Sequence, residues 1–192
     1  MPTTGQFGFS VAKIQHFTEN TSPDDKVPIK NDDFKSIQND KHIKYIKLSE
    51  RTGWNAGRAA LLSQVTTEYF VSCDDDHEFN QNTNLEKMLD IIQHTGFDIV
   101  GGGFGKSTLT QWGSMARYQV QHGQSGHCLT RHAGFHGTLA SYPNCQVGDV
   151  ISNFFIARTL TAGSIRFDPL FTQIAHREYF VDGIGQLRIA VW

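Results

Sequence analysis

Apolar positions in the first half of the chain recur with the periods of helices and strands. AGRAALLSQV, residues 56–65, is rich in helix-forming residues, and its apolar side chains have helical spacing. EYFVSC, residues 68–73, is an aromatic and β-branched run typical of a buried strand. A shorter apolar stretch at 45–48 favours another strand, ahead of a turn at 51–53. The pattern therefore predicts strand, helix and strand in this order.

The alternation continues through the middle of the chain. Apolar residues at 85, 88, 89 and 92 repeat at i, i+3, i+4 and i+7, which predicts a helix with one buried face. Thr83 to Glu86 has the form of a capping box at its start, and Gly96 is a plausible stop. The next strand is predicted at 97–100, directly after that stop.

Short alternating helices and strands predict an α/β fold with a mainly parallel mixed sheet flanked by helices. VISNFFIAR, residues 150–158, is a further strong strand, and 172–182 is expected to be a mixed helical segment. Residues 1–42 are polar and are interrupted by turn-forming residues, so we expect an irregular lead-in there and a catalytic domain over 43–192. Since the lead-in offers no convincing strand, the sheet is expected to lack its first strand.

Composition narrows the class of protein. The chain has 192 residues, of which 39% are hydrophobic, which is enough for one compact domain. A net charge of −2 gives no reason to expect nucleic acid as a partner. Its apolar runs are only a few residues long, and the first residues lack the pattern of a signal peptide.

A glycine-rich segment at 101–108, GGGFGKST, resembles a nucleotide-binding P-loop at first sight. A P-loop has four residues between its first glycine and the Gly-Lys-Ser/Thr, whereas Gly101 and Gly105 are separated by three. A helix should also follow directly, and the residues after 108 start a helix poorly. We therefore favour a glycine-rich turn whose bare backbone lets another group approach closely. A P-loop that depends on Lys106 is the remote alternative.

The strongest chemical signal is SCDDDH, residues 72–77. The predicted strand delivers Asp74, Asp75 and Asp76 to its carboxyl end, where ligands collect in open α/β sheets. Three crowded carboxylates repel one another unless a cation lies among them, and Mg²⁺ or Mn²⁺ prefers such oxygen ligands together with substrate phosphates. The pattern favours a metal and diphosphate site, and the alternative is a solvated acidic turn.

Four longer blocks carry a resemblance to a known family. GWNAGRAALLSQVTTEYFVSCDDDHEF resembles the nucleotide-sugar half of a GT-A glycosyltransferase, where Asp-x-Asp closes a strand. GHCLTRHAGFHGTL, YPNCQVGDVISNFFIART and IRFDPLFTQIAHREYFVDGIGQLRI are similar to the β1,4-N-acetylgalactosaminyltransferases of the ganglioside-synthase and Sd(a)-synthase type. The likeness covers about residues 43–190.

That resemblance implies an inverting transfer of N-acetylgalactosamine from UDP-GalNAc to a glycan or glycolipid acceptor in β1,4 linkage, with Mn²⁺ (or Mg²⁺) as the metal. It places Asp74 near the ribose, makes Asp76 the main metal ligand with Asp74 beside it, and leaves Asp75 as a less certain donor contact. Arg58 matches a position that supports the nucleotide end, and its guanidinium suits phosphate or carboxylate. An ordinary salt-bridging arginine is the alternative.

Inversion by a single displacement needs a carboxylate base for the acceptor hydroxyl. Glu178 and Asp182 lie four positions apart and therefore share one face if this segment is helical. We assign the base to Glu178 and expect Asp182 to be structural, with the reverse assignment as the alternative. Asp149 is expected either to contact the donor sugar or to hold a turn. His176 is more typical of a structural histidine than of a metal ligand.

Other expectations follow from the same resemblance. A lumenal enzyme of this kind implies a disulfide between Cys128 and Cys145, residence in the Golgi, and a membrane anchor outside these residues. In a reducing compartment both cysteines would instead remain free thiols. Cys73, inside the predicted strand, is expected to be a buried thiol. We also expect the chain to be incomplete relative to the family at both ends, so an inactive relative or fragment that only binds sugar nucleotide or glycan is the main alternative.

Overall fold

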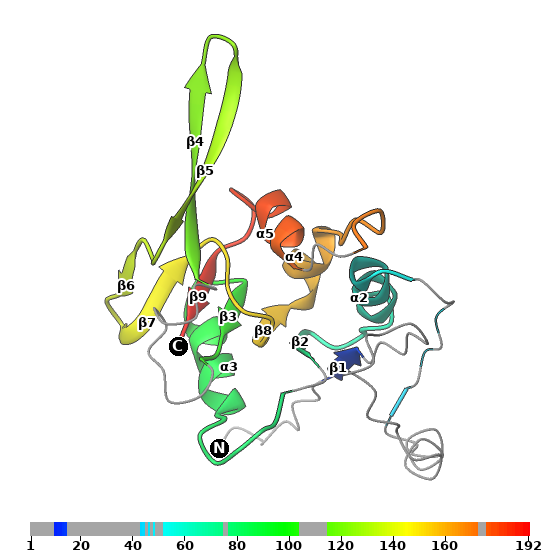
Figure 1. Ribbon diagram of the computed structural model, residues 1–192. Helices are drawn as coiled ribbons and strands as arrows, with labels where there is room; N and C mark the ends of the chain where they lie inside the picture. The colour runs from blue at the N-terminus through cyan, green and yellow to red at the C-terminus, as the bar shows by residue number, and fades with distance from the viewer. Residues whose placement is uncertain are drawn as a thin grey trace, which may run out of the picture.

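The computed structural model describes residues 10–14, 43–44, 46, 48, 52–74, 77–103, 115–172 and 176–192. Within them, seven strands form one sheet in the order β1-β2-β8-β3-β9-β7-β6, and β4 and β5 form a separate ribbon. This ribbon projects away from the body (Figure 1). The elements are β1 Ser10–Ile14, α2 Trp54–Leu62, β2 Tyr69–Asp74, α3 Leu85–His94, β3 Ile99–Gly101, β4 Ala116–Gly123, β5 Gly126–Ala133, β6 Gly137–Leu139, β7 Tyr142–Gly148, β8 Phe155–Arg158, α4 Thr159–Ser164, α5 Arg177–Asp182 and β9 Ile189–Val191.

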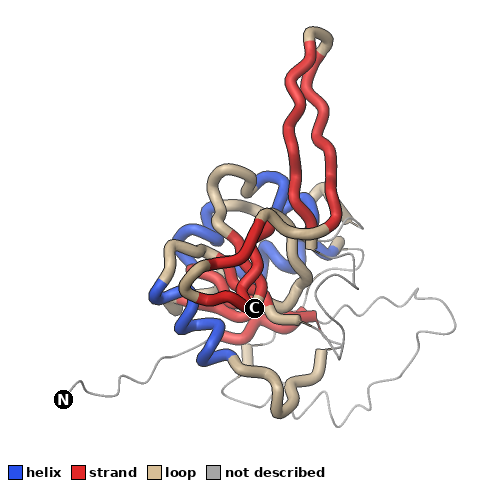
Figure 2. The backbone as a smooth tube through the Cα atoms, turned by 90° about the vertical axis from the view of Figure 1, so that its left-hand side faces the viewer, coloured by secondary structure: helices blue, strands red, loops and turns tan. Residues whose placement is uncertain are grey.

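Helices cover both faces of the sheet, and each face has its own apolar core. Successive side chains of a strand point to opposite faces. In β8, Phe155 and Ala157 therefore pack on the side of α2, α4 and α5, while Ile156 packs on the side of α3. Figure 2 shows the helices around the central strands. The α/β class is confirmed, as a sheet between two helical layers.

The sheet is mixed as expected, but parallel pairs do not dominate it. Among the described strands, β1 with β2 and β3 with β9 are parallel, and the other four neighbouring pairs are antiparallel. The reason is that β8 enters between β2 and β3 in the opposite direction, while β6 and β7 form a hairpin. The expected majority of parallel pairs is wrong, although β2 and β3 still run in the same direction.

The expected absence of a first strand is also wrong. Residues Ser10–Ile14 form β1, which pairs in parallel with β2 and places Ile14 beside Asp74. SVAKI is too short to give a clear period of its own. Its pairing partner lies more than fifty residues later in the sequence, so a local pattern did not reveal this strand.

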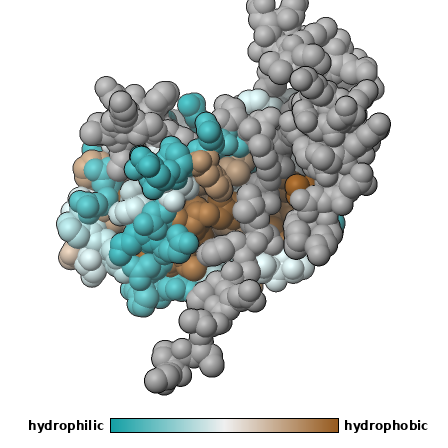
Figure 3. Space-filling view, turned by 90° about the horizontal axis from the view of Figure 1, so that it is seen from below, coloured by the Kyte–Doolittle hydropathy of each residue, from teal (hydrophilic) through white to brown (hydrophobic). Residues whose placement is uncertain are grey.

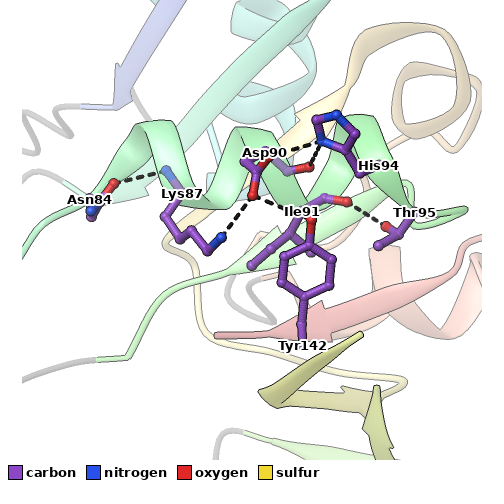
Figure 4. A network of polar contacts seen from close by, with 7 residues as sticks. All are labelled: Asn84, Lys87, Asp90, Ile91, His94, Thr95 and Tyr142. Carbon is purple, nitrogen blue, oxygen red and sulfur yellow. Dashed lines mark hydrogen bonds and ion pairs between the residues drawn. The ribbon is translucent and has the colours of Figure 1, made fainter. Parts of the chain in front are cut away.

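Helices α2 and α3 confirm the two helical predictions, although the start of α3 differs in detail. Its N-cap is Asn84, whose side-chain oxygen accepts a hydrogen bond from the Lys87 N–H at 2.8 Å (Figure 4). Thr83 instead accepts a hydrogen bond from the Asn80 N–H at 3.0 Å. The expected capping box is thus replaced by an Asn cap one residue later, which satisfies the same kind of unpaired helix N–H.

A polar network fastens α3 to strand β7 (Figure 4). Asp90 accepts hydrogen bonds from the Lys87 ammonium at 2.8 Å and from the Tyr142 hydroxyl at 3.3 Å. The bond from Lys87 is the main reason that the pKa of Asp90 is lowered. This surface network connects the α3 layer to the far end of the sheet.

Two predicted strands differ from the structure. The described residues of the 45–48 stretch, Ile46 and Leu48, are not in a strand. The run 150–158 contains only β8, Phe155–Arg158. The first half of this run is mostly buried but is not a strand, and Val150 forms an isolated bridge to Ala116 at the base of the ribbon. A continuous apolar run predicts burial more securely than strand.

The described surface seen from below is mostly hydrophilic, with a smaller hydrophobic strip (Figure 3). Among the described residues, no helix has the length and apolar character needed to cross a membrane.

Candidate functional site

Asp74 ends strand β2 at the sheet edge where β1 and β3 also end. Phe70 packs in the core beside α2, and Ser72 follows it on the same face of the strand. Asp74, two residues further, therefore points toward α2. Asp75 and Asp76 lie outside the described residues, so their predicted roles stay predictions.

Arg58 on α2 reaches the carboxylate of Asp74. Its Nη2 lies 2.9 Å from Asp74 Oδ1, and the arginine side chain is only 6% exposed against 36% for Asp74. Burial lowers the pKa of Arg58, and the neighbouring Asp74 charge opposes that shift. The guanidinium Nε and Nη1 have no hydrogen-bond partner among the described residues. Arg58 is thus a buried cation with one carboxylate partner and two further donors.

A second group holds the same carboxylate oxygen of Asp74. Asn153, in the segment before β8, is buried and donates from Nδ2 to Asp74 Oδ1. Its own Oδ1 accepts a hydrogen bond from Ser72 Oγ at 2.9 Å. The backbone N–H of Asp74 also donates to His77 Nδ1 at 3.2 Å. Sequence reasoning missed Asn153, and the available signal was a polar residue inside the apolar run 150–158.

Glu178 lies in the first turn of α5, which confirms that the AHREYFVDG segment is helical at this point. Its Oε2 accepts a hydrogen bond from Asn55 Nδ2 at 2.8 Å, and the Asp168 N–H donates weakly to its carboxylate at 3.3 and 3.4 Å. Burial is the main reason that the pKa of Glu178 is raised to about 7, followed by a hydrogen bond with Asp182. A carboxyl that titrates near neutral pH suits proton transfer.

One face of α2 connects these two carboxylates. Asn55 and Arg58 are three positions apart on this helix, so they lie on the same face. Asn55 binds Glu178 and Arg58 binds Asp74. Asn55 is completely buried, and sequence reasoning missed it. The structure therefore brings Arg58, Asp74 and Glu178 into one site, although they come from three elements.

His176 precedes α5 and contributes a neutral imidazole to this region. Burial, together with the charge of Arg58, lowers the pKa of His176 to about 4. Its Nδ1 is buried and has no hydrogen-bond partner among the described residues. The ring also packs edge-on against Phe180 at 5.9 Å between centroids. The interpretation of His176 as a structural group stays a prediction.

Asp182 and Asp149 occupy different surroundings. Asp182 is the last residue of α5 and is exposed. Its hydrogen bond and its charge both help to raise the pKa of Glu178. Asp149 accepts hydrogen bonds from the Tyr118 N–H at 2.6 Å and from His136 at 2.8 Å. These bonds tie Asp149 to the base of the β4–β5 ribbon. Its described contacts support the turn interpretation, and a role in sugar binding stays a prediction.

The described residues contain no group of three histidine, cysteine or acidic side chains arranged to hold a metal ion. Asp74 is the described carboxylate at the predicted metal position, and its Oδ1 is held by Arg58 and Asn153. Its partial exposure and oxygen ligand type are compatible with a hard cation such as Mn²⁺ or Mg²⁺.

An apolar pocket adjoins Arg58 on the α2 side of the sheet. It contains about 370 Å³ of space, part of it open to solvent, and aromatic residues including Phe70, Phe155 and Phe167 line it. Arg58 and Ser72 provide polar atoms at its wall. This lining explains the desolvation of the guanidinium, and it is too apolar to be the main binding surface for a diphosphate.

The expected disulfide between Cys128 and Cys145 is wrong, since both residues carry free thiols. Cys128 lies near the tip of the projecting ribbon, opposite Gln121, whereas Cys145 is buried in the core under α3. The two belong to different sheets, which the sequence spacing did not indicate (Figure 1).

Thiol labelling checks this result. We expect a maleimide to modify Cys128 rapidly in the folded chain, because that side chain is exposed. Cys73 and Cys145 should react only after unfolding, since both are buried and burial raises the pKa of Cys145 to about 11. Cys128→Ser should abolish the rapid phase. Slow labelling of the native protein that reducing agent accelerates would contradict the assignment and indicate a disulfide.

The glycine segment provides close packing at its described end. A Cβ atom on Gly102 would lie 2.5 Å from the Phe154 ring, and one on Gly101 would lie 2.8 Å from Ile151. At these two positions the group that approaches the bare backbone is a side chain of the protein itself, which agrees with the turn interpretation. Lys106 lies outside the described residues, so the P-loop alternative is not tested there.

Gly102→Ala should destabilise the fold by about 1–3 kcal/mol, because the added methyl group overlaps the buried face of Phe154. The matched control is Gly163→Ala in α4, where an added Cβ meets no atom within 4 Å. That control should be neutral or stabilise by up to about 1 kcal/mol. Urea unfolding measures both. Equal midpoints for the two variants would contradict the packing argument.

The sequence profile of Glycosyl transferase family 2 matches residues 17–159. The chain is 39% identical over 152 residues to the β-1,4 N-acetylgalactosaminyltransferase 1 of Rattus norvegicus, covering 78% of this chain and 28% of the relative. It is 33% identical over 168 residues to the β-1,4 N-acetylgalactosaminyltransferase 2 of Mus musculus, covering 87% of this chain and 32% of the relative. The chain thus spans under a third of the length of these two relatives.

Among solved structures, the chain is similar to S. aureus TarS 1-349 in complex with UDP, with a TM-score of 0.52 and 17% identity. The match covers 88% of this chain and 46% of that chain. At this identity the likeness concerns the fold, and it agrees with the GT-A type of α/β architecture expected from the sequence.

Proposed function

The chain belongs to glycosyl transferase family 2, and we propose that it transfers N-acetylgalactosamine from UDP-GalNAc to a glycan acceptor in β1,4 linkage with inversion. The names of the two relatives support the sugar and the linkage. The UDP bound to TarS supports the nucleotide. No partner among nucleic acids is proposed, because the net charge is −2.

The observation that carries the proposal is the connection of Asp74 and Glu178 through one face of α2. Asp74, fixed by Arg58, suits the polar nucleotide end of the donor. Glu178, with its pKa raised to about 7, suits the acceptor end. A transferase needs these two functions beside each other, and α2 provides the physical link.

Glu178 is the general base in this proposal. The acceptor oxygen forms a bond to the anomeric carbon while the bond from that carbon to the diphosphate oxygen breaks, and UDP departs. Glu178 takes the acceptor's hydroxyl proton. The Asn55 amide and the Asp168 N–H hold the carboxylate during this transfer.

A divalent ion fits the chemistry of the strand-end carboxylates. Asp76 and Asp74 would hold Mn²⁺ or Mg²⁺ together with the donor phosphates, with Asp74 committed in part to Arg58. When bound, the ion neutralises charge on the departing diphosphate. We also propose residence in the Golgi lumen, the compartment expected from the family resemblance.

Calorimetry with UDP-GalNAc, followed by a transfer assay on a panel of glycans, tests the proposal. We expect donor binding that requires Mn²⁺, fails in Asp76→Asn, and leads to a β1,4-linked product. Donor binding without transfer to any acceptor would favour the inactive sugar-nucleotide-binding relative. Equal donor affinity with Mn²⁺ and with EDTA would overturn the metal assignment.

A further inference from the structure

Two exposed histidines face each other near the tip of the β4–β5 ribbon. His122 on β4 is the direct partner of His127 on β5. Their Nδ1 atoms are 2.9 Å apart, and their rings meet edge-to-face with centroids 4.6 Å apart. One ring nitrogen therefore donates a hydrogen bond to the other, and both nitrogens already lie close together on one face of the ribbon.

We propose that His122 and His127 form a chelating site for a borderline divalent metal such as Ni²⁺ or Zn²⁺. Metal–imidazole bonds are about 2.0–2.1 Å long. Two such bonds at right angles, as in tetragonal Ni²⁺ sites, place their nitrogens about 2.9 Å apart. The observed separation matches this value, so the two Nδ1 atoms already lie at a chelating distance. Each exposed ring turns to aim its Nδ1 lone pair at the metal, and the Nδ1 proton that joined the rings moves to Nε2 of the same imidazole.

The composition of the ribbon selects the class of metal. Residues 116–133 contain no Asp or Glu, so hard cations such as Mg²⁺ and Ca²⁺ find no carboxylate there. Imidazole ligands instead suit Zn²⁺, Ni²⁺ and Cu²⁺. The histidine pair is therefore chemically different from the carboxylates that follow strand β2.

The side chains next to the histidine pair on the same face of the ribbon offer no further metal ligand, so the two imidazoles are the protein ligands there. Cys128 is adjacent to His127 along the strand, and alternation directs it to the opposite face together with Gln121. The next pair on the histidine face is Val120 and Leu129, which are apolar. Water completes the coordination sphere, since both histidines are exposed.

Metal binding would stabilise the ribbon itself. A two-stranded ribbon without further sheet neighbours is marginally stable in water. The metal would join the two strands next to the Gly123–Gly126 turn and so keep them from separating there. This end of the ribbon is the one farthest from Asp149, which binds Tyr118 at the ribbon's base. The site is thus a metal clip for a projecting element.

Calorimetric titration of the full chain with NiCl₂ and ZnCl₂ tests the site. His122→Ala and His127→Ala should each weaken binding at least about tenfold. His132→Ala on the same ribbon and Cys128→Ser are matched controls and should bind as the wild type does. Unchanged binding in both His122→Ala and His127→Ala, or loss of binding in Cys128→Ser alone, would overturn the proposal.

Hydrogen exchange provides a second measurement that does not depend on sugar transfer. With Ni²⁺, amides of residues 116–133 should exchange more slowly in the wild type and in His132→Ala, but not in His122→Ala. Circular dichroism confirms that the variants are folded. Protection that persists in His122→Ala would contradict the metal clip.

Discussion

Glu178→Gln lowers the rate of sugar transfer by about 10²–10⁴-fold, the usual contribution of a general base. Glutamine keeps the size of the side chain but cannot take the acceptor proton. Donor affinity should change by no more than about twofold, because the proposed function assigns Glu178 to the acceptor and not to the donor. Single-turnover transfer measures the first effect, and calorimetry with UDP-GalNAc measures the second.

The pH dependence gives this prediction an independent readout. Glu178 acts as a base only when deprotonated, and its pKa is raised to about 7. The transfer rate should therefore rise with pH up to about 7 and then level off. Asp182→Asn removes a hydrogen bond and a charge that raise this pKa, so the rising limb should move to lower pH while transfer persists. Loss of transfer in Asp182→Asn, with activity retained in Glu178→Gln, would reverse the assignment.

Stability separates a catalytic defect from misfolding. Because the pKa of Glu178 is raised in the folded chain, the folded state binds more protons than the unfolded state between its ordinary value and about 7. The contribution of Glu178 to unfolding free energy therefore falls as pH rises through this window. Glu178→Gln should be at least as stable as the wild type at pH 8, measured by thermal unfolding.

Asp74→Ala should destabilise the fold and abolish donor binding. The variant leaves the buried Arg58 guanidinium without its carboxylate partner. A fully buried pair costs about 3–5 kcal/mol when one partner is removed, and the partial exposure of Asp74 reduces this to about 2 kcal/mol. Urea unfolding measures the loss, and calorimetry with UDP-GalNAc measures donor binding.

Two further variants identify the cause of that loss. The double variant Arg58→Met/Asp74→Ala removes the buried charge and should recover part of the stability but none of the donor affinity. Lys87→Met breaks the exposed ion pair with Asp90 and should leave the free energy of unfolding close to that of the wild type. A double variant that is no more stable than Asp74→Ala would show that the buried charge is not responsible.

Local patterns were sufficient for the elements whose own side-chain order is strongly periodic or continuously apolar. The 3.6-residue rhythm identified α2 and α3, and the apolar run of β2 correctly delivered Asp74 to the sheet edge. Glu178 was recognised from its family motif, and its place in a helix is confirmed. In each case, short-range periodicity or an ordered motif contained the information.

Residues that act through distant neighbours were missed. Asn55 lies just before the predicted helix 56–65, and only the packing of α5 beside α2 shows that it binds Glu178. Asn153 looked like an interruption in an apolar run, yet it holds Asp74 from 79 residues away. Conversely, the expected disulfide between Cys128 and Cys145 is absent, because the β4–β5 ribbon carries Cys128 away from the sheet that contains Cys145.

The sequence by itself determined the α/β class, the amphipathic helices and the position of the acidic cluster after a buried strand, because these depend on side-chain order over a few turns. Only the tertiary structure decided the pairing of β1, the antiparallel insertion of β8 and the meeting of Arg58, Asp74 and Glu178 around α2. Those features depend on which segments, far apart in the sequence, pack together and exclude water. The local spacing of residues does not show which segments these are.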